Sequence, residues 1–109
     1  MNQVFALTVF LAAALLEVGG DAVIRKGLRG NAPTLIAAGF VMLGAYGLVV
    51  NTVRWDFSRL LGVYVTVFAV VSVLWGRFVF KEEVPAATWA GLLLIVAGGL
   101  VIQFGQRSR

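Results

Sequence analysis

Four apolar runs of about 20 residues, each long enough for an α-helix to cross a bilayer, fill most of this 109-residue chain. Their expected bounds are 4–24, 33–53, 60–80 and 85–104, and only short polar connections separate them. Because backbone groups in lipid must be satisfied within the segment, such runs predict helices. We therefore expect an all-α integral membrane protein. Its single domain, residues 1–109, would hold four transmembrane helices running alternately up and down.

The amino-acid composition excludes several classes of protein and of functional site. Hydrophobic residues make up 61% of the chain and charged residues 13%, against about 45–50% and about 25% in soluble domains. The chain has no cysteine and no histidine, which excludes disulfides, thiolate metal sites and the commonest general base. We expect no enzyme, no cofactor, no metal site and no nucleic-acid partner. Any activity is expected among the helices, in contact with the lipid bilayer.

Positive charges are almost evenly divided between the two expected membrane sides. Four lie on the side of the termini (Arg54, Arg59, Arg107 and Arg109), and five lie on the other (Arg25, Lys26, Arg29, Arg77 and Lys81). Membrane orientation follows the Lys/Arg bias, which is nearly absent here. Two interpretations stay open: one orientation fixed by a minor bias, or insertion both ways to form an antiparallel homodimer.

A glutamate, Glu17, lies inside the first apolar run, where an ionisable side chain costs about 2.5–3.5 kcal/mol on insertion scales. The chain has only five acidic residues, and we expect an acid at this position to serve function. At helical spacing it shares a face with small and acidic residues, namely Ala13, Ala14, Gly20 and Asp21. Small residues leave room beside the carboxylate, so Glu17 is the first candidate for a proton and cation site. The alternative is a buried hydrogen bond between helices.

A second acid, Asp21, follows Glu17 by one helical turn and lies nearer to the end of the run. It is a candidate for a further acid in the same pathway. The alternative is a helix-end ion pair with Arg25, four residues further on.

The third run carries aromatic and hydroxyl residues at helical spacing: Tyr64, Phe68, Ser72 and Trp75. Aromatic faces attract organic cations, at about 0.5–2 kcal/mol per contact. Beside an intramembrane acid, this stripe predicts an aromatic wall for a cationic substrate, which Tyr46 of the second run could join. The alternative is ordinary packing between helices.

In the fourth run, Ala87, Gly91 and Gly98 share one face and no charged side chain interrupts it. Small residues let helix backbones approach closely in lipid, so this run is expected to form a dimer interface. The alternative is packing within one chain.

The segment Leu16–Lys26 resembles the first-helix motif of the small multidrug resistance family of the drug/metabolite transporter superfamily. Glu17, Gly20 and Arg25 fall on the motif's glutamate, glycine and basic residue. The resemblance extends over nearly the whole chain, through Gly62-Val63-Tyr64 and the spaced glycines of the fourth run. It implies an antiparallel dual-topology dimer in the bacterial inner membrane. In that dimer the two glutamates bind protons and a cationic substrate in turn.

The sequence departs from that family at several positions. Phe68 falls close to the family's third-helix tryptophan, and Ala69-Val70-Val71 replace the glycines that let that helix kink. Asp21 stands where the family has an uncharged residue. The run 62–65 is similar to a less characterised group of four-span proteins. Phe80-Lys81-Glu82, with the following Trp89 and Gly91, is similar to the wider superfamily, including small lipid-linked sugar flippase subunits.

Together these features predict a proton-coupled exporter of small organic or lipophilic cations that works by alternating access, with Glu17 as the shared site. A homodimer, protons and a cationic small molecule are the expected partners. Two alternatives remain: a small flippase-type subunit for a lipid-linked substrate, and a non-transporting membrane assembly subunit.

Overall fold

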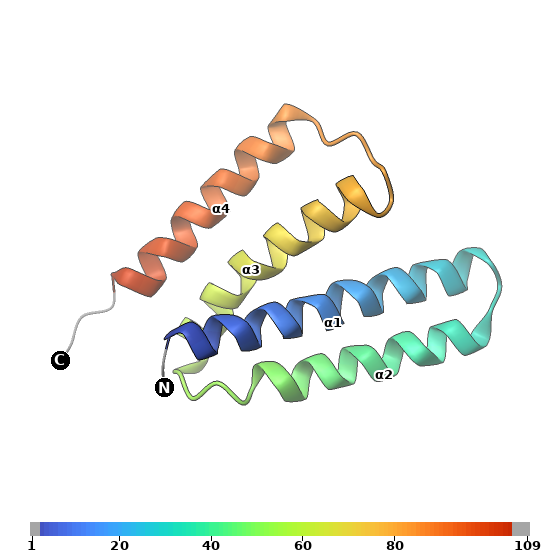
Figure 1. Ribbon diagram of the computed structural model, residues 1–109, viewed down its shortest axis with the longest axis horizontal. Helices are drawn as coiled ribbons and strands as arrows, with labels where there is room; N and C mark the ends of the chain where they lie inside the picture. Colours follow the sequence, from blue (N-terminus) through green and yellow to red (C-terminus); the bar gives the residue numbers. More distant parts are fainter. Residues whose placement is uncertain (1–2, 106–109) are drawn as a thin grey trace. The chain divides into compact units, whose positions relative to one another are not determined.

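The computed structural model describes residues 3–105 and contains four α-helices in this part of the chain (Figure 1). They are α1 (Gln3–Arg29), α2 (Pro33–Val50), α3 (Phe57–Phe78) and α4 (Ala86–Phe104). Each is long and apolar enough to cross a membrane, which confirms the predicted four-helix membrane class. Two of the counted cations, Arg107 and Arg109, lie outside the described residues.

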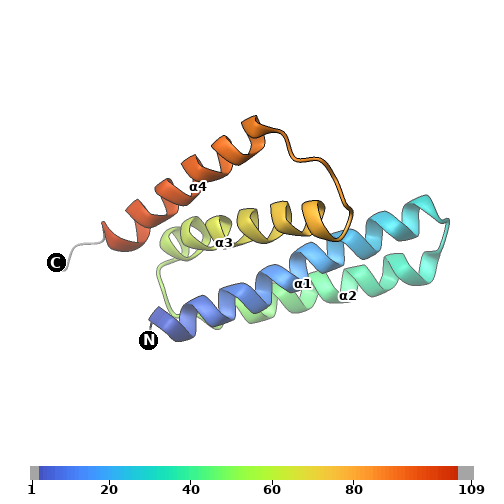
Figure 2. The same ribbon diagram turned by 45° about the horizontal axis from the view of Figure 1, so that its top comes forward.

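The chain divides into two compact units, Met1–Arg54 and Trp55–Arg109. The first holds α1 and α2 and the second holds α3 and α4, each pair forming a helical hairpin (Figure 2). Each hairpin is described by itself below.

The helix α1 continues past the expected end at Ile24 and stops only at Arg29. The three cations of this end, Arg25, Lys26 and Arg29, are good helix formers and suit a helix C-terminus. The turn comes at Asn31, whose φ of 54° is left-handed, a conformation that asparagine tolerates. The Ala32 N–H then donates to the Gly27 carbonyl at 2.8 Å, as in a Schellman motif.

The helix α2 starts at Pro33, where a missing N–H removes no helix hydrogen bond, and ends at Val50. The predicted end was Val53, and two polar side chains end the helix before that residue. Asn51 Nδ2 donates to the Gly47 carbonyl at 2.8 Å, and Thr52 Oγ1 donates to the Val49 carbonyl at 2.6 Å. Side chains that bond to nearby carbonyls in this way compete with helix continuation.

Small residues bring α1 and α2 together. A Cβ placed at Gly39 would collide with Ile24 and with the Gly20 carbonyl. A Cβ at Gly20 would lie 3.1 Å from Leu43, and one at Gly27 would lie 2.9 Å from Ile36. This hairpin is therefore packed at glycine contacts, as expected where lipid supplies no hydrophobic driving force.

The second hairpin, formed by α3 and α4, also packs at glycines. A Cβ at Gly99 of α4 would collide with Thr66 of α3, and one at Gly62 would lie 2.8 Å from Ile102. At the N-terminal end of α3, the Arg59 guanidinium donates a hydrogen bond to Gln103 Oε1 at 3.1 Å. These contacts fix the register of α3 on α4.

Candidate functional site

Glu17 lies at the middle of α1 and is partly buried. The small residues of its predicted stripe, Ala13, Ala14 and Gly20, are all buried. Gly20 owes its burial to the close approach of Leu43 and Gly39 on α2. The small-residue side of α1 therefore faces α2 around Glu17.

The register of the hairpin gives Glu17 its neighbour. Three contacts define how the antiparallel helices align: Gly27 with Ile36, Ile24 with Gly39, and Gly20 with Leu43. Moving three or four residues towards the N-terminus of α1 therefore corresponds to moving the same number towards the C-terminus of α2. One further step, three residues before Gly20 and three after Leu43, pairs Glu17 with Tyr46. The charge of Glu17 acts on the Tyr46 hydroxyl, which agrees with this pairing.

The Glu17–Tyr46 layer is polar, and the layers beside it are not. On one side the same register aligns the pair Gly20 and Leu43, and on the other it aligns Ala13 with Val50. Ala13 and Val50 are both buried, with exposed fractions of 0% and 1%. An acid and a hydroxyl thus share one level of an otherwise apolar helix interface.

The second acid, Asp21, is exposed on the surface of the hairpin, one turn from Glu17. Its neighbour along the chain, Arg25, is also exposed. Asp21 lies outside the glycine-packed side of α1, and its function stays a prediction.

The aromatic stripe lies on α3. The rings of Tyr64 and Phe68 are neighbours, with centroids 6.3 Å apart and planes tilted by 33°. Tyr64 is buried to an exposed fraction of 2%, whereas Phe68 is partly exposed. The spacing of four residues therefore places these two rings beside each other on α3. Because α3 and α1 belong to different units, the opposition of this stripe to Glu17 stays a prediction.

The other two members of the stripe differ in how their polar atoms are used. Ser72 Oγ donates to the Ala69 carbonyl at 2.9 Å, so its hydroxyl hydrogen bonds within its own helix. Trp75 Nε1 is buried and has no hydrogen-bond partner among the described residues.

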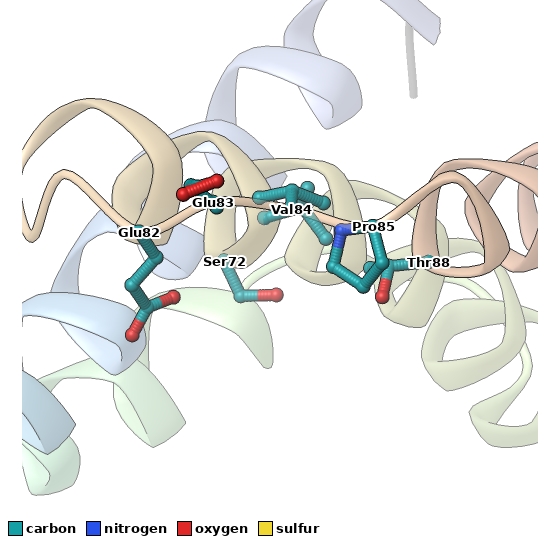
Figure 3. Close-up of a pocket in the computed structure, with 7 residues that line it drawn as sticks. Ser72, Glu82, Glu83, Val84, Pro85 and Thr88 are labelled. Atoms are coloured by element: carbon teal, nitrogen blue, oxygen red, sulfur yellow. The ribbon is translucent and has the colours of Figure 1, made fainter.

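Ser72 also lines a pocket of about 220 Å³ where α3 meets the connection to α4 (Figure 3). The remaining lining residues come from α3, the connection and the first turn of α4: Val73, Glu82, Glu83, Val84, Pro85 and Thr88. The Glu82 N–H donates to the Gly76 carbonyl at 2.9 Å, which holds this acid beside α3. This pocket could not be predicted from the position of Ser72 in the sequence, because it depends on the path of the connection between α3 and α4.

The expected dimer residues of α4 are open. Ala87 and Gly98 are exposed and Gly91 is partly so, and apart from the neighbouring backbone of α4 no described atom lies within 4 Å of a Cβ built on either glycine. The glycine that packs within the hairpin is instead Gly99, one position along. Sequence spacing alone did not separate these two faces of α4.

The described residues, 3–105, include no group of three or more acidic side chains that could hold a metal ion. The polar groups of the site are instead a carboxylate and a phenol. This pair can hold a proton or a cation and can exchange hydrogen bonds.

Comparison with known proteins identifies relatives along the whole chain. The family described as "Uncharacterised BCR, YnfA/UPF0060 family" matches residues 3–108. A UPF0060 membrane protein of Streptomyces coelicolor is 38% identical over 105 residues, 92% of this chain and 91% of that protein. One of Nocardia farcinica is 37% identical over 112 residues, 99% of each chain. The YfjF protein of Bacillus subtilis is 32% identical over 97% of this chain and 99% of its own. No solved structure matches.

Full-length bacterial relatives named as membrane proteins, together with four apolar helices, confirm the predicted multi-pass bacterial membrane protein. The family that matches is related to the drug/metabolite transporter superfamily, to which the small multidrug resistance proteins also belong. The chain is a member of the YnfA/UPF0060 family.

Proposed function

We propose that this protein is a proton-coupled secondary transporter that exports small organic or lipophilic cations by alternating access. One observation carries the proposal. Glu17, a partly buried acid at the middle of a membrane-spanning helix, shares a level with Tyr46 inside an otherwise apolar helix interface. Intramembrane acids are expensive and typically mark proton or ion pathways. The resemblance of Leu16–Lys26 to the small multidrug resistance motif supports the same role for Glu17.

The coupling follows from a single negative site. A proton and a cationic substrate both neutralise the Glu17 carboxylate, so binding of one releases the other. Such competition is a coupling free energy between two ligands and acts equally in both directions. The Tyr64–Phe68 pair of α3 is proposed to face the substrate, with Ser72 and Trp75 of the same stripe.

A second copy of the chain is proposed to pack on α4. Gly91 and Gly98 leave an open strip on this helix, and in lipid such strips allow close approach of another helix. The near balance of positive charges favours an antiparallel pair, which builds from two copies the inverted symmetry common in transporters.

The decisive experiment is uptake into proteoliposomes with an imposed pH gradient, using cations from guanidinium to tetraalkylammonium. We expect wild-type protein to accumulate at least one cation only while the gradient lasts. Glu17→Gln is expected to reduce uptake to that of empty liposomes, because the neutral amide cannot exchange proton for cation. Asp56→Asn, which changes an exposed acid between the hairpins, serves as the matched control and should transport normally.

Uptake that survives in Glu17→Gln would overturn the role of this residue. Absence of gradient-driven uptake for every cation would contradict the transporter and favour the flippase-type or assembly-subunit alternatives.

A further inference from the structure

We infer that Tyr46 is the positioning residue of Glu17: its hydroxyl donates a hydrogen bond to the carboxylate of the same chain and holds it within the α1–α2 interface. The role rests on the proposed function, since it describes how the proton and cation site is kept ready. This role separates Tyr46 from the aromatic wall of α3, which the sequence pattern predicted that it could join.

The first support is the rigid register of the hairpin. Gly20 lies against Leu43, and Ile24 lies against Gly39, with contacts too close to admit a Cβ without movement. Glu17 and Tyr46 come one step further along both helices, so the glycine contacts set the distance between them. A phenol adds little freedom of its own, because tyrosine has two side-chain torsions.

The second support is that no formal charge on α2 competes for Glu17. The helix Pro33–Val50 carries no Asp, Glu, Lys or Arg. On α1 the charged neighbours are Asp21, Arg25, Lys26 and Arg29, of which Asp21 is the closest in sequence and is exposed. From the element packed against Glu17, Tyr46 is thus the titratable group that faces it, and the Glu17 charge acts on its hydroxyl.

The third support is chemical. A proton-coupled acid alternates between a charged form, which needs a donor, and a protonated form, which needs an acceptor. A tyrosine hydroxyl provides both, so neither form leaves an unpaired polar group in the interface. A lysine or arginine at this position would favour only the charged form. Tyr46 therefore suits an acid that must gain and lose a proton in every cycle.

The test follows the Glu17 carboxyl directly by ¹³C NMR of protein labelled with [¹³C]glutamate in lipid nanodiscs. The chain has three glutamates, Glu17, Glu82 and Glu83, and the Glu17 resonance is the one missing from Glu17→Gln. Tyr46→Phe keeps the ring and removes only the hydroxyl. We expect it to shift the pH midpoint of the Glu17 resonance, because the carboxyl loses its hydrogen-bond partner in α2.

Two controls separate the hydroxyl from general disturbance of α2. Leu48→Phe changes a side chain that is 77% exposed and should leave the midpoint in place. The double variant Tyr46→Phe/Leu48→Tyr restores the number of tyrosines on the wrong face and should not restore the midpoint. Equal midpoints in wild type and Tyr46→Phe, or an equal shift in Leu48→Phe, would overturn the inference.

A second measurement observes the same contact from the tyrosine. The Tyr46 Cζ resonance should titrate with the Glu17 midpoint in wild type and lose that step in Glu17→Gln; a step that persists would also overturn the inference. Addition of tetrapropylammonium to wild type tests the proposed function separately, since a bound cation should displace the proton from Glu17. If the tyrosine effects appear and no cation from guanidinium to tetraalkylammonium displaces the proton, the positioning role stands and the transport proposal fails.

Discussion

Arg59 joins three parts of the second hairpin through one side chain. Its guanidinium carbon lies 3.9 Å from the centre of the Trp55 ring, and its terminal nitrogen donates to Gln103 at 3.1 Å. Its Nε is buried and has no hydrogen-bond partner among the described residues. A planar, delocalised cation is suited to such a stack, whereas a compact ammonium is not.

We predict that Arg59→Lys destabilises the α3–α4 hairpin by about 1 kcal/mol, from the weakened stack and the altered hydrogen bond. The free energy of unfolding in mixed detergent and sodium dodecyl sulfate micelles, followed by tryptophan fluorescence, measures the effect. Arg77→Lys is the matched control, because Arg77 is exposed and lies 5.4 Å from the Phe78 ring. A similar loss in both variants would show that Arg59 has no special contribution.

At the residue scale, Glu17 could be predicted as a functional residue from the sequence, because an acid within an apolar run stands out by composition alone. The position of Tyr46 beside Glu17 could not be predicted, since a tyrosine in a membrane helix is equally compatible with helix packing, a headgroup anchor or a substrate site. The pairing depends on the register of two helices, which Gly20, Gly27 and Gly39 set through contacts far apart in sequence.

At the element scale, glycines on one face of a helix pack against the neighbouring helix, whereas glycines on another face do not. On α2, Gly39 lies against Ile24 and Gly20, whereas a Cβ on Gly44 would meet nothing within 4 Å. The same contrast separates Gly99 from Gly98 on α4. A stripe of small residues therefore predicts a close helix contact only when the neighbouring helix is known.

We predict that Gly39→Val destabilises the α1–α2 hairpin by about 1–3 kcal/mol, as overpacking does, and reduces cation transport with it. Gly44→Val, the same change on an open face, should stay within about 0.5 kcal/mol of wild type. Equilibrium unfolding by circular dichroism in mixed micelles compares the two. Equal losses would mean that β-branching in the helix, rather than the contact with α1, is responsible.

The helix ends also show where local sequence is sufficient. The start of α4 after Pro85 follows from proline chemistry, and the helix ends at Phe104, as the apolar run suggested. The end of α2 does not follow from hydropathy, because Val53 is apolar but Asn51 and Thr52 already bond back to the helix. Side-chain hydrogen bonds to the backbone decide such cases, and periodicity does not record them.

At the scale of the whole molecule, the proposed dimer can be tested because the chain has no cysteine. We predict that copies carrying Gly91→Cys cross-link to copies carrying Gly98→Cys in membranes, more strongly than either cross-links to itself. An antiparallel pair of α4 helices brings these unlike positions together, whereas a parallel pair brings like positions together. Oxidation followed by non-reducing electrophoresis of differently tagged copies distinguishes the products.

Leu93→Cys provides the control for this experiment, because it is 71% exposed but lies on another face of α4. Efficient self-cross-linking at Gly91 and Gly98 would contradict the antiparallel arrangement. Cross-linking of Leu93→Cys as strong as that of the glycine positions would contradict α4 as a specific interface.

The unequal lengths of α1 and α2 have a consequence for the surrounding lipid. The 27 residues of α1 extend roughly 40 Å and the 18 residues of α2 roughly 27 Å, while a hydrocarbon core is about 30 Å thick. The shorter helix cannot gain length by tilting, because tilt only reduces the thickness that it spans. A few Å of local thinning, or flanking side chains that reach to the interface, make up this small difference, so we expect a thinner membrane to suit this hairpin better than a thicker one.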